Sequence, residues 1–212
     1  MDIILYSGGM DSTVLLHEFQ REIKLAVSFA YGSRHNSNEI ECAAENCRSL
    51  EIEHEIIILP LQKIFKSNSL LNSNIDVPEG PYTEERLKST VVPFRNGILL
   101  SLAIGLAEER KFNRVLIANH AGDHTIYPDC RPDFINHMSQ AGKTGTFQQV
   151  EIFAPYTFLT KREIALKGQK MGVDFRATWS CYKGESVHCG KCSTCLERKE
   201  ALEGFDPTVY QS

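Results

Sequence analysis

Two stretches of the sequence carry residue types that can do chemistry: a glycine-rich turn near its start and a group of cysteines near its end. The turn, SGGMDST (7–13), follows a short apolar run that ends at Tyr6. Glycines let the backbone approach an anion closely, and the unpaired N–H groups at the start of a helix attract negative charge. The turn therefore predicts an anion site, with a glycine turn that merely caps a helix as the alternative.

The side chains of the turn favour phosphate as the anion. Ser7, Ser12 and Thr13 provide hydroxyl donors, whereas Asp11 repels phosphate and so requires a metal ion or a structural hydrogen bond. The turn matches neither GxxxxGK[ST] nor GxGxxG, and it contains no lysine.

Four of the seven cysteines are spaced C-x7-C-x2-C-x2-C. They are Cys181, Cys189, Cys192 and Cys195. In a reducing compartment this density favours a metal over disulfides, and four thiolates complete a tetrahedral Zn²⁺ site with no position for water, so the zinc would be structural. The alternatives are an iron–sulfur cluster, His188 in place of one cysteine, or four unrelated buried cysteines.

The composition is that of an ordinary globular protein. Of the 212 residues, 42% are hydrophobic and 24% are charged, and the formal net charge is −4. The acidic balance argues against direct nucleic-acid binding, because phosphate neutralisation needs excess lysine and arginine. The sequence has no apolar run of membrane-spanning length and no signal segment, so we expect a cytoplasmic protein with no membrane partner.

Strand-length apolar runs alternate with amphipathic segments along most of the chain. Strands are expected at 3–6, 25–31, 54–60, 114–120 and 149–156. Helices are expected at 12–22, 38–50, 95–111, 132–141 and 160–172, with a short last helix after the cysteines. This alternation predicts the α/β class, a Rossmann-like doubly wound parallel sheet whose ligands bind beyond the carboxyl ends of the strands.

Two segments interrupt or follow the alternation. Residues 1–176 would form the α/β domain, and residues 177–212 a small zinc-binding segment with a terminal helix. The polar stretch 62–93 is too long for an ordinary connection, so we expect a lid-like or partly disordered loop.

Six short motifs, in this order, closely resemble the 7-cyano-7-deazaguanine synthase family of queuosine biosynthesis, within the ATP-pyrophosphatase (PP-loop) superfamily. They are SGGMDST, YGSRH (31–35), VPFRN (92–96), YPDCRPDF (127–134), TWSCY (178–182) and CGKCSTC (189–195). The resemblance implies an ATP-dependent C–N ligase that converts 7-carboxy-7-deazaguanine and ammonia into the nitrile, through adenylated acid and amide intermediates. It also implies Mg²⁺ with ATP, and a homodimer.

The resemblance and the expected fold together suggest roles for individual residues. The ATP-binding residues would be Tyr6, Ser7, Gly8, Gly9, Met10, Asp11, Ser12 and Thr13. The catalytic residues would be Asp11, Arg34, His35 and Arg95. The substrate-binding residues would be Asn96, Asp123, Tyr127, Asp129 and Arg131. One carboxylate that accepts two donors would read the guanine-like edge of the substrate, and Asp123 and Asp129 are the candidates.

Several of these residues also have plain structural interpretations. His35 can be a hydrogen-bonded loop histidine, and Asn96 can cap a helix. Lys161 is interpreted as a solvated lysine at a helix start, with a phosphate contact as the alternative. Cys130 is taken as structural, because adenylation requires no protein nucleophile.

Two other functions remain open at this point. The first is a PP-loop enzyme that adenylates another carboxylate or tRNA; tRNA-thiolating relatives usually carry an added RNA-binding domain, and no basic extension is present here. The second is a non-enzymatic zinc module that binds nucleic acid or protein. The product of the favoured activity would serve tRNA or DNA modification.

Overall fold

The computed structural model describes residues 1–72, 74–81, 89–125 and 127–211. Its centre is a five-stranded sheet of order β3-β2-β1-β4-β5, in which every pair of neighbours is parallel. The strands are β1 (Asp2–Leu5), β2 (Ile23–Ala30), β3 (Glu53–Ile58), β4 (Arg114–Leu116) and β5 (Glu151–Phe153). The chain runs outward from β1 to β3 and then returns to the other side of β1. This confirms the expected doubly wound α/β fold.

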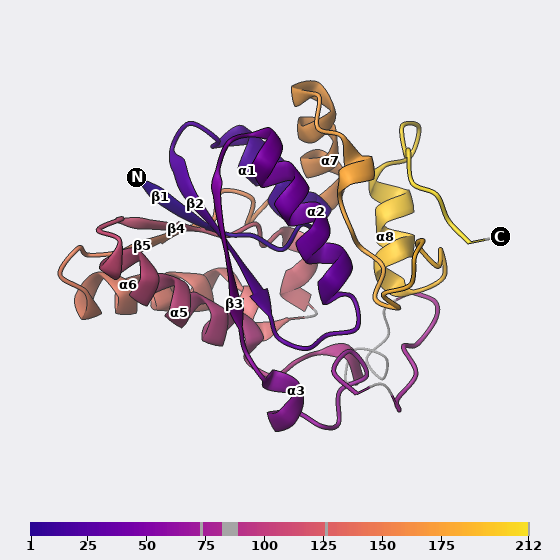
Figure 1. The fold of residues 1–212 in the computed structure, drawn as a ribbon, viewed down its shortest axis with the longest axis horizontal. Helices are drawn as coiled ribbons and strands as arrows, with labels where there is room; N and C mark the ends of the chain where they lie inside the picture. The colour runs from indigo at the N-terminus through magenta and orange to yellow at the C-terminus, as the bar shows by residue number, and fades with distance from the viewer. Residues whose placement is uncertain (73, 82–88, 126, 212) are drawn as a thin grey trace.

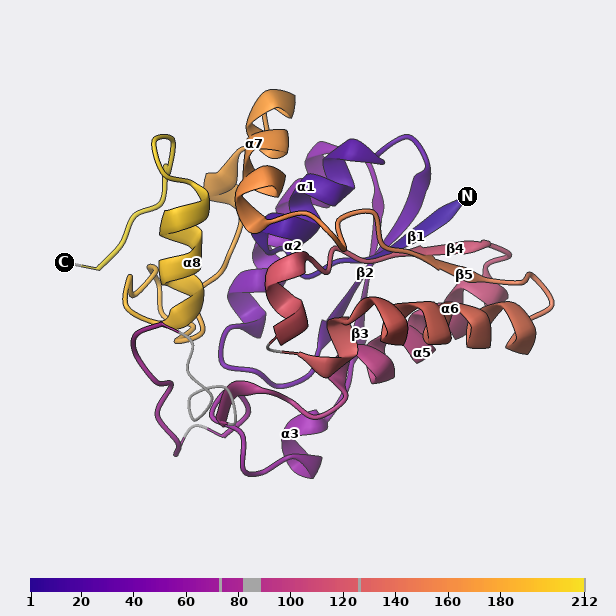
Figure 2. The same ribbon diagram turned by 180° about the vertical axis from the view of Figure 1, so that it is seen from behind.

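Helices cover both faces of the sheet, as Figures 1 and 2 show. The cluster formed with α1, α2 and α7 buries Ile4 and Leu116, whereas the cluster formed with α5 and α6 buries Ile3 and Val115. Adjacent strand residues thus point to opposite faces, as the pleat requires. These helices are α1 (Met10–Glu18), α2 (Asn36–Ser49), α5 (Arg95–Glu109), α6 (Pro132–Gly145) and α7 (Lys161–Met171).

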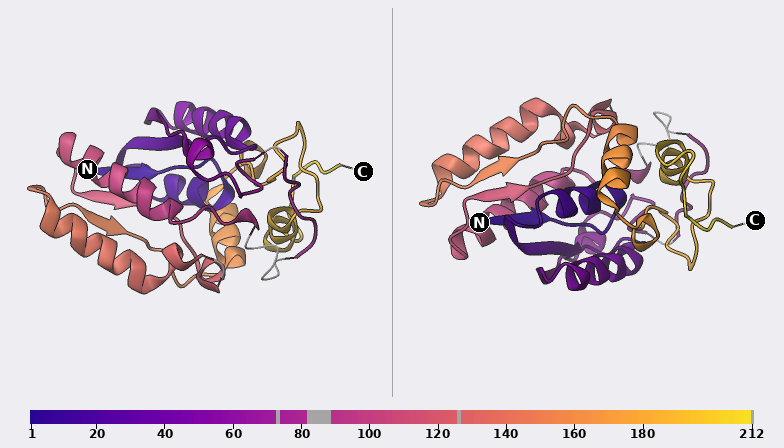
Figure 3. Two further views of the ribbon diagram at one scale, coloured as in Figure 1. Left: turned by 90° about the horizontal axis from the view of Figure 1, so that it is seen from below. Right: turned by 90° about the horizontal axis from the view of Figure 1, so that it is seen from above.

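Short elements complete the described chain. They are α3 (Leu61–Ile64), α8 (Ser193–Ala201) and the 3-10 turns η1 (Ala121–Thr125), η2 (Pro128–Cys130) and η3 (Phe175–Ala177). Figure 3 shows α8 and the C-terminus at the end of the molecule opposite the N-terminus. Within the described ranges, no helix is both long and apolar enough to cross a membrane.

The start and the end of α7 follow local sequence signals. The Thr160 side chain accepts a hydrogen bond from the Glu163 backbone, and the Glu163 side chain accepts one from the Thr160 backbone. This confirms the capping box. The helix ends at Gly172, whose φ of 75° lies in the left-handed region that glycine tolerates.

The described part of the stretch 62–93 is packed against the rest of the protein. Leu71 and Val92 join the apolar cluster under α5, and Leu70 and Val77 pack against the cysteine segment. Residues 73 and 82–88 lie outside the described residues, so a lid at this stretch stays a prediction. The boundary between residues 176 and 177 also stays a prediction.

Gly8 makes the closest backbone approach that the site depends on. Its φ is +79°, and an added Cβ would lie 2.1 Å from the carbonyl oxygen of Glu39 in α2. We therefore expect Gly8→Ala to lower the free energy of unfolding by about 2 kcal/mol or more in urea denaturation.

The control is Gly105→Ala on the exposed face of α5, where no atom of the described residues lies within 4 Å of an added Cβ. This variant should be neutral or stabilised by up to about 1 kcal/mol. Equal stabilities of the two variants would contradict the interpretation of Gly8.

Candidate functional site

A cavity of about 240 Å³ lies beyond the carboxyl ends of β1, β2 and β4, where the strand order switches direction. Many residues predicted from the sequence line it together: Tyr6, Ser7, Gly9, Met10, Asp11, Ser12, His35, Arg95, Asn96, Asp123 and Tyr127. Other predicted residues are absent from this lining: Gly8, Thr13, Arg34, Asp129 and Arg131. The topology thus brings together motifs that lie far apart in the sequence.

The loop after β1 is held by its own hydroxyl groups. The Ser7 hydroxyl accepts a hydrogen bond from the Gly9 N–H at 3.1 Å and lies 3.0 Å from the Ser12 hydroxyl. The Thr13 hydroxyl donates to the Gly9 carbonyl at 2.8 Å. Gly9 caps α1 without a side-chain hydrogen bond, so the N–H groups of the first turn are available for an anion.

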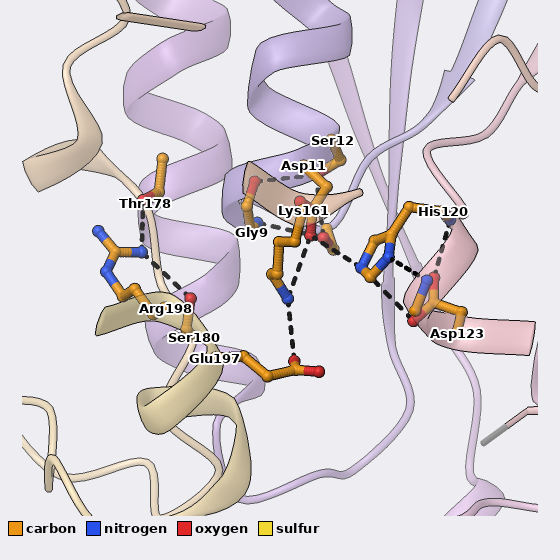
Figure 4. Close-up of polar contacts among 12 residues, drawn as sticks. Gly9, Asp11, Ser12, His120, Asp123, Lys161, Thr178, Ser180, Glu197 and Arg198 are labelled. Atoms are coloured by element: carbon orange, nitrogen blue, oxygen red, sulfur yellow. Dashed lines mark hydrogen bonds and ion pairs between the residues drawn. The ribbon is translucent and has the colours of Figure 1, made fainter. Parts of the chain in front are cut away.

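Asp11 and Lys161 face each other at this loop, as Figure 4 shows. Asp11 Oδ2 lies 3.5 Å from Lys161 Nζ, and Asp11 Oδ1 is buried with no hydrogen-bond partner among the described residues. Lys161 Nζ also donates to Glu197 Oε2 at 3.2 Å. Burial opposes the lysine charge, but Asp11 and Glu197 together raise the pKa of Lys161 above its ordinary value. The interpretation of Lys161 as a solvated lysine was therefore wrong, since its side chain is 19% exposed and lines the cavity.

His120 is a site residue that the sequence analysis missed. Its Nδ1 accepts the Gly122 N–H at 3.1 Å, so the neutral ring carries its proton on Nε2. That nitrogen lies 3.6 Å from Asp123 Oδ1 and 4.0 Å from Asp11 Oδ2 (Figure 4). The available signal was its position just after β4, at the rim where parallel sheets bind ligands.

A second polar group surrounds Arg95 at the start of α5. Arg95 Nη1 donates to the Tyr31 hydroxyl at 3.3 Å. Burial opposes its charge, but Tyr31 and other neighbouring groups raise the pKa of Arg95, so the guanidinium is a cation in the cavity wall.

Burial, with the Arg95 charge, lowers the pKa of His35 to about 4, so His35 is neutral at pH 7. Glu39 of α2, another residue that the sequence analysis missed, lies 3.7 Å from His35.

Three predicted residues outside the cavity contact the scaffold. Arg34 Nη2 donates to the carbonyl of Asn72 at 2.9 Å, within the stretch 62–93. Asp129 Oδ2 accepts the Asn96 N–H at 2.8 Å at the start of α5. Arg131 Nε donates to the carbonyl of His124 at 3.1 Å. Their catalytic or substrate-binding roles stay predictions.

Asn96 and Cys130 form a buried pair at the cavity wall. Asn96 Nδ2 donates to Cys130 Sγ at 3.0 Å. Burial raises the pKa of the Cys130 thiol well above its ordinary value, with nearby Asp123 adding to the effect. A neutral thiol is a poor nucleophile, which agrees with the structural interpretation of Cys130.

The four clustered cysteines form a candidate metal centre. The Sγ atoms of Cys181, Cys189, Cys192 and Cys195 all lie within 4.8 Å of one another, and all four residues are buried. The N–H of Cys192 points at Cys189 Sγ at 3.3 Å, a contact that favours a thiolate. His188 is engaged elsewhere, since its Nε2 accepts the Ser180 N–H at 3.2 Å. Four buried sulfur ligands with no open position suit a structural metal.

Arg198 connects this centre to the cavity wall. It lies in α8, is fully buried, and donates to the hydroxyls of Thr178 and Ser180 at 2.8 and 3.1 Å (Figure 4). Ser180 lines the cavity together with its neighbour Trp179. The metal centre therefore supports one wall of the site.

The fold and the site define an α/β protein with a glycine-rich loop lining a cavity at its switch point and a four-cysteine candidate metal centre nearby. Residues 1–206 match the family model of "Queuosine biosynthesis protein QueC". The chain belongs to this family, and the resemblance drawn from the six sequence motifs is confirmed.

Curated relatives carry one name. A 7-cyano-7-deazaguanine synthase of Porphyromonas gingivalis is 52% identical over 212 residues, covering 99% of this chain and 96% of the relative. Another from Desulfotalea psychrophila is 49% identical over 213 residues, covering 98% and 97%. These names indicate an enzyme with small-molecule substrates. Among solved structures, an NMN synthetase from Francisella tularensis shares the fold, with a TM-score of 0.52 at 15% identity over 98% of this chain and 79% of that one.

The contact between Asp129 and Asn96 generates a stability prediction. Asp129→Ala should lower the free energy of unfolding by about 1–2 kcal/mol, because it leaves the Asn96 N–H buried and unpaired. The control is Asp133→Ala in the exposed first turn of α6, which should cost less than about 1 kcal/mol. Urea denaturation measures both, and an Asp129→Ala variant as stable as the parent would refute the capping role.

Proposed function

We propose that the chain is an ATP-dependent C–N ligase that converts 7-carboxy-7-deazaguanine and ammonia into 7-cyano-7-deazaguanine. Its family membership and the names of its relatives support this activity. The observation that carries the proposal is that the SGGMDST loop, Lys161 and Arg95 line a single cavity. That cavity offers positive charge and backbone N–H groups to a triphosphate and to a substrate carboxylate.

The chemistry requires two activations, because a carboxylate is a poor acylating agent. A carboxylate oxygen attacks the α-phosphorus of ATP and pyrophosphate leaves. Ammonia then attacks the acyl carbon and AMP leaves, which gives the amide. A second ATP adenylates the amide oxygen, and loss of AMP with the two N–H protons leaves the nitrile. Each step moves highly charged groups, so positioning and charge stabilisation carry the catalysis.

The residues of the loop would bind the departing pyrophosphate. The first-turn N–H groups of α1 and the hydroxyls of Ser7 and Ser12 would donate to its oxygens, and Lys161 would offset its charge. Arg95 would attract the substrate carboxylate. The neutral Cys130 thiol has no role in this scheme.

Two metal ions fit the described side chains. Asp11 lines the cavity and has a buried Oδ1 without a partner among the described residues, so this carboxylate would hold Mg²⁺ that arrives with ATP. That ion would help to neutralise the triphosphate. The four cysteines would hold Zn²⁺ in a closed, structural site.

Other features of the proposal come from the sequence. We propose a cytoplasmic protein that does not contact nucleic acid directly, in keeping with its net charge of −4. A homodimer, and a product that serves tRNA or DNA modification, are part of the same proposal.

The activity is tested by incubating the protein with 7-carboxy-7-deazaguanine, ammonium, Mg²⁺ and ATP. We expect the nitrile by mass spectrometry, with two AMP released per nitrile. Asp11→Asn should lower the rate by about 100-fold or more, because it removes charge at the proposed metal and phosphate site. Asp174→Asn, at an exposed carboxylate paired with Arg176, is the matched control and should retain the parent rate.

An active preparation that leaves this acid unchanged but exchanges pyrophosphate into ATP with a different carboxylate would assign another substrate. A preparation that catalyses no exchange with any carboxylate would favour the non-enzymatic zinc module.

The metal centre generates its own prediction. Cys192→Ser should lose bound zinc and lower the melting temperature by about 5 °C or more, since metal binding and folding of the C-terminal segment are coupled. Cys42→Ser, outside the cluster, should keep the zinc content of the parent. Elemental analysis and thermal unfolding measure both, and a zinc-free variant with unchanged melting would refute the coupling.

A further inference from the structure

We propose that Glu39 reads the guanine-like edge of the substrate, the edge that carries a ring N–H and an exocyclic amino group. This inference rests on the proposed function, since it names the residue that selects the base. It replaces Asp123 and Asp129, the two candidates from the sequence, with a residue that the sequence analysis did not consider.

Few carboxylates are placed to bind the guanine-like edge of the substrate. Among the described residues, Asp11, Glu39 and Asp123 line the cavity. Asp11 belongs to the phosphate loop, beside Lys161. Asp123 accepts the His120 backbone N–H at 3.0 Å, and its other oxygen faces the His120 ring. Asp129 lies outside the lining and accepts the Asn96 N–H. Glu39 is therefore the carboxylate that the scaffold does not use.

The Glu39 carboxylate is poorly satisfied in the protein itself. Its side chain is 17% exposed, and the nearest cation-forming atom is His35 Nε2 at 3.7 Å, too far for a hydrogen bond. Within the described part of the chain, no side-chain hydrogen bond to this carboxylate is present. Buried polar groups nearly always have partners, so an acceptor left in a cavity wall indicates a ligand that brings donors.

His35 provides an independent observation at the same place. Its side chain is 3% exposed and lines the cavity, and its Nδ1 has no hydrogen-bond partner among the described residues. His35 Nδ1 and the Glu39 carboxylate thus have no hydrogen-bond partner among the described residues of this wall. A single ligand with several polar atoms along one edge would satisfy both.

The chemistry of the substrate matches this group. The ring N–H and the exocyclic amino group of a deazaguanine are neighbouring, coplanar donors, and a carboxylate can accept both at once. The Arg95 charge acts on both His35 and Glu39. The group therefore combines an acceptor with a cation, and the substrate combines donors with a carboxylate. Burial raises the pKa of Glu39 to about 8, against the opposing effect of Arg95. Two N–H donors from a ligand would offset the effect of burial and favour the ionised form.

The test compares the substrate with its 2-desamino analogue, which lacks the exocyclic amino group. The parent enzyme should prefer the full substrate by about 100-fold or more in kcat/KM, because the analogue leaves a buried acceptor unpaired. Glu39→Gln retains the shape but has only one acceptor oxygen, so its preference should fall below about 10-fold. The KM values for ATP and ammonium should stay within about 2-fold of the parent.

Glu45→Gln, on the exposed side of the same helix, is the matched control and should keep the full preference. Should Glu39→Gln fail to fold, Glu39→Asp shortens the side chain by one methylene and should also reduce the preference. A Glu39 variant that keeps the parent preference would overturn the inference. A Glu39 variant that keeps the preference but has a raised KM for ammonium would indicate that Glu39 binds ammonia instead. A parent enzyme that converts neither compound would overturn the proposed function, and this inference with it.

Discussion

The close contact between the backbone at Gly8 and the first turn of α2 is the constraint on which the rest of the site depends. Gly8 turns the chain from β1 into α1, and an added Cβ would meet the Glu39 carbonyl at 2.1 Å. The Gly8 carbonyl accepts the Trp179 N–H at 3.0 Å, which places the C-terminal segment on the same residue. The loop after β1, α2 and one cavity wall therefore meet at a glycine that no other residue can replace without strain.

The metal centre matters for the site because of how its segment is joined to the cavity wall. Arg198 is fully buried and donates to neutral oxygens of Thr178, Ser180 and Phe175. A buried guanidinium without a carboxylate contact is tolerated only when several acceptors are held in place. The four cysteines fix the loop that leads into α8, so they hold Arg198 where those acceptors are. The position of Ser180 in the cavity wall thus depends on Arg198 and on the cysteine segment that carries it.

The sequence predicted the fold, the glycine turn between β1 and α1, and the cysteine cluster, because each is encoded locally by periodicity, glycines or spacing. It was less informative for side chains whose direction depends on packing. Lys161 looked like a solvated helix start, yet the contact between α7 and the loop turns it toward Asp11. Arg34 follows β2 at the ligand-binding rim, yet its guanidinium holds the backbone of a distant segment. In the sequence, Glu39 is not distinguished from the other polar residues of an amphipathic helix. In the structure, the contact of its backbone with Gly8 brings it to the cavity.

Among the described residues, three carboxylates line the cavity, and Lys161 and Arg95 are the cations that line it with them. Lys161 lies beside Asp11, and the His120 ring lies between Asp11 and Asp123. At the second group the Arg95 charge acts on Glu39, and the neutral His35 lies 3.7 Å from the Glu39 carboxylate. Under the proposed function, ATP with its metal ion would complete the first set of charges. Under the proposed function, the second set would be completed by a ligand that brings N–H donors together with a negative group, as a deazaguanine acid does.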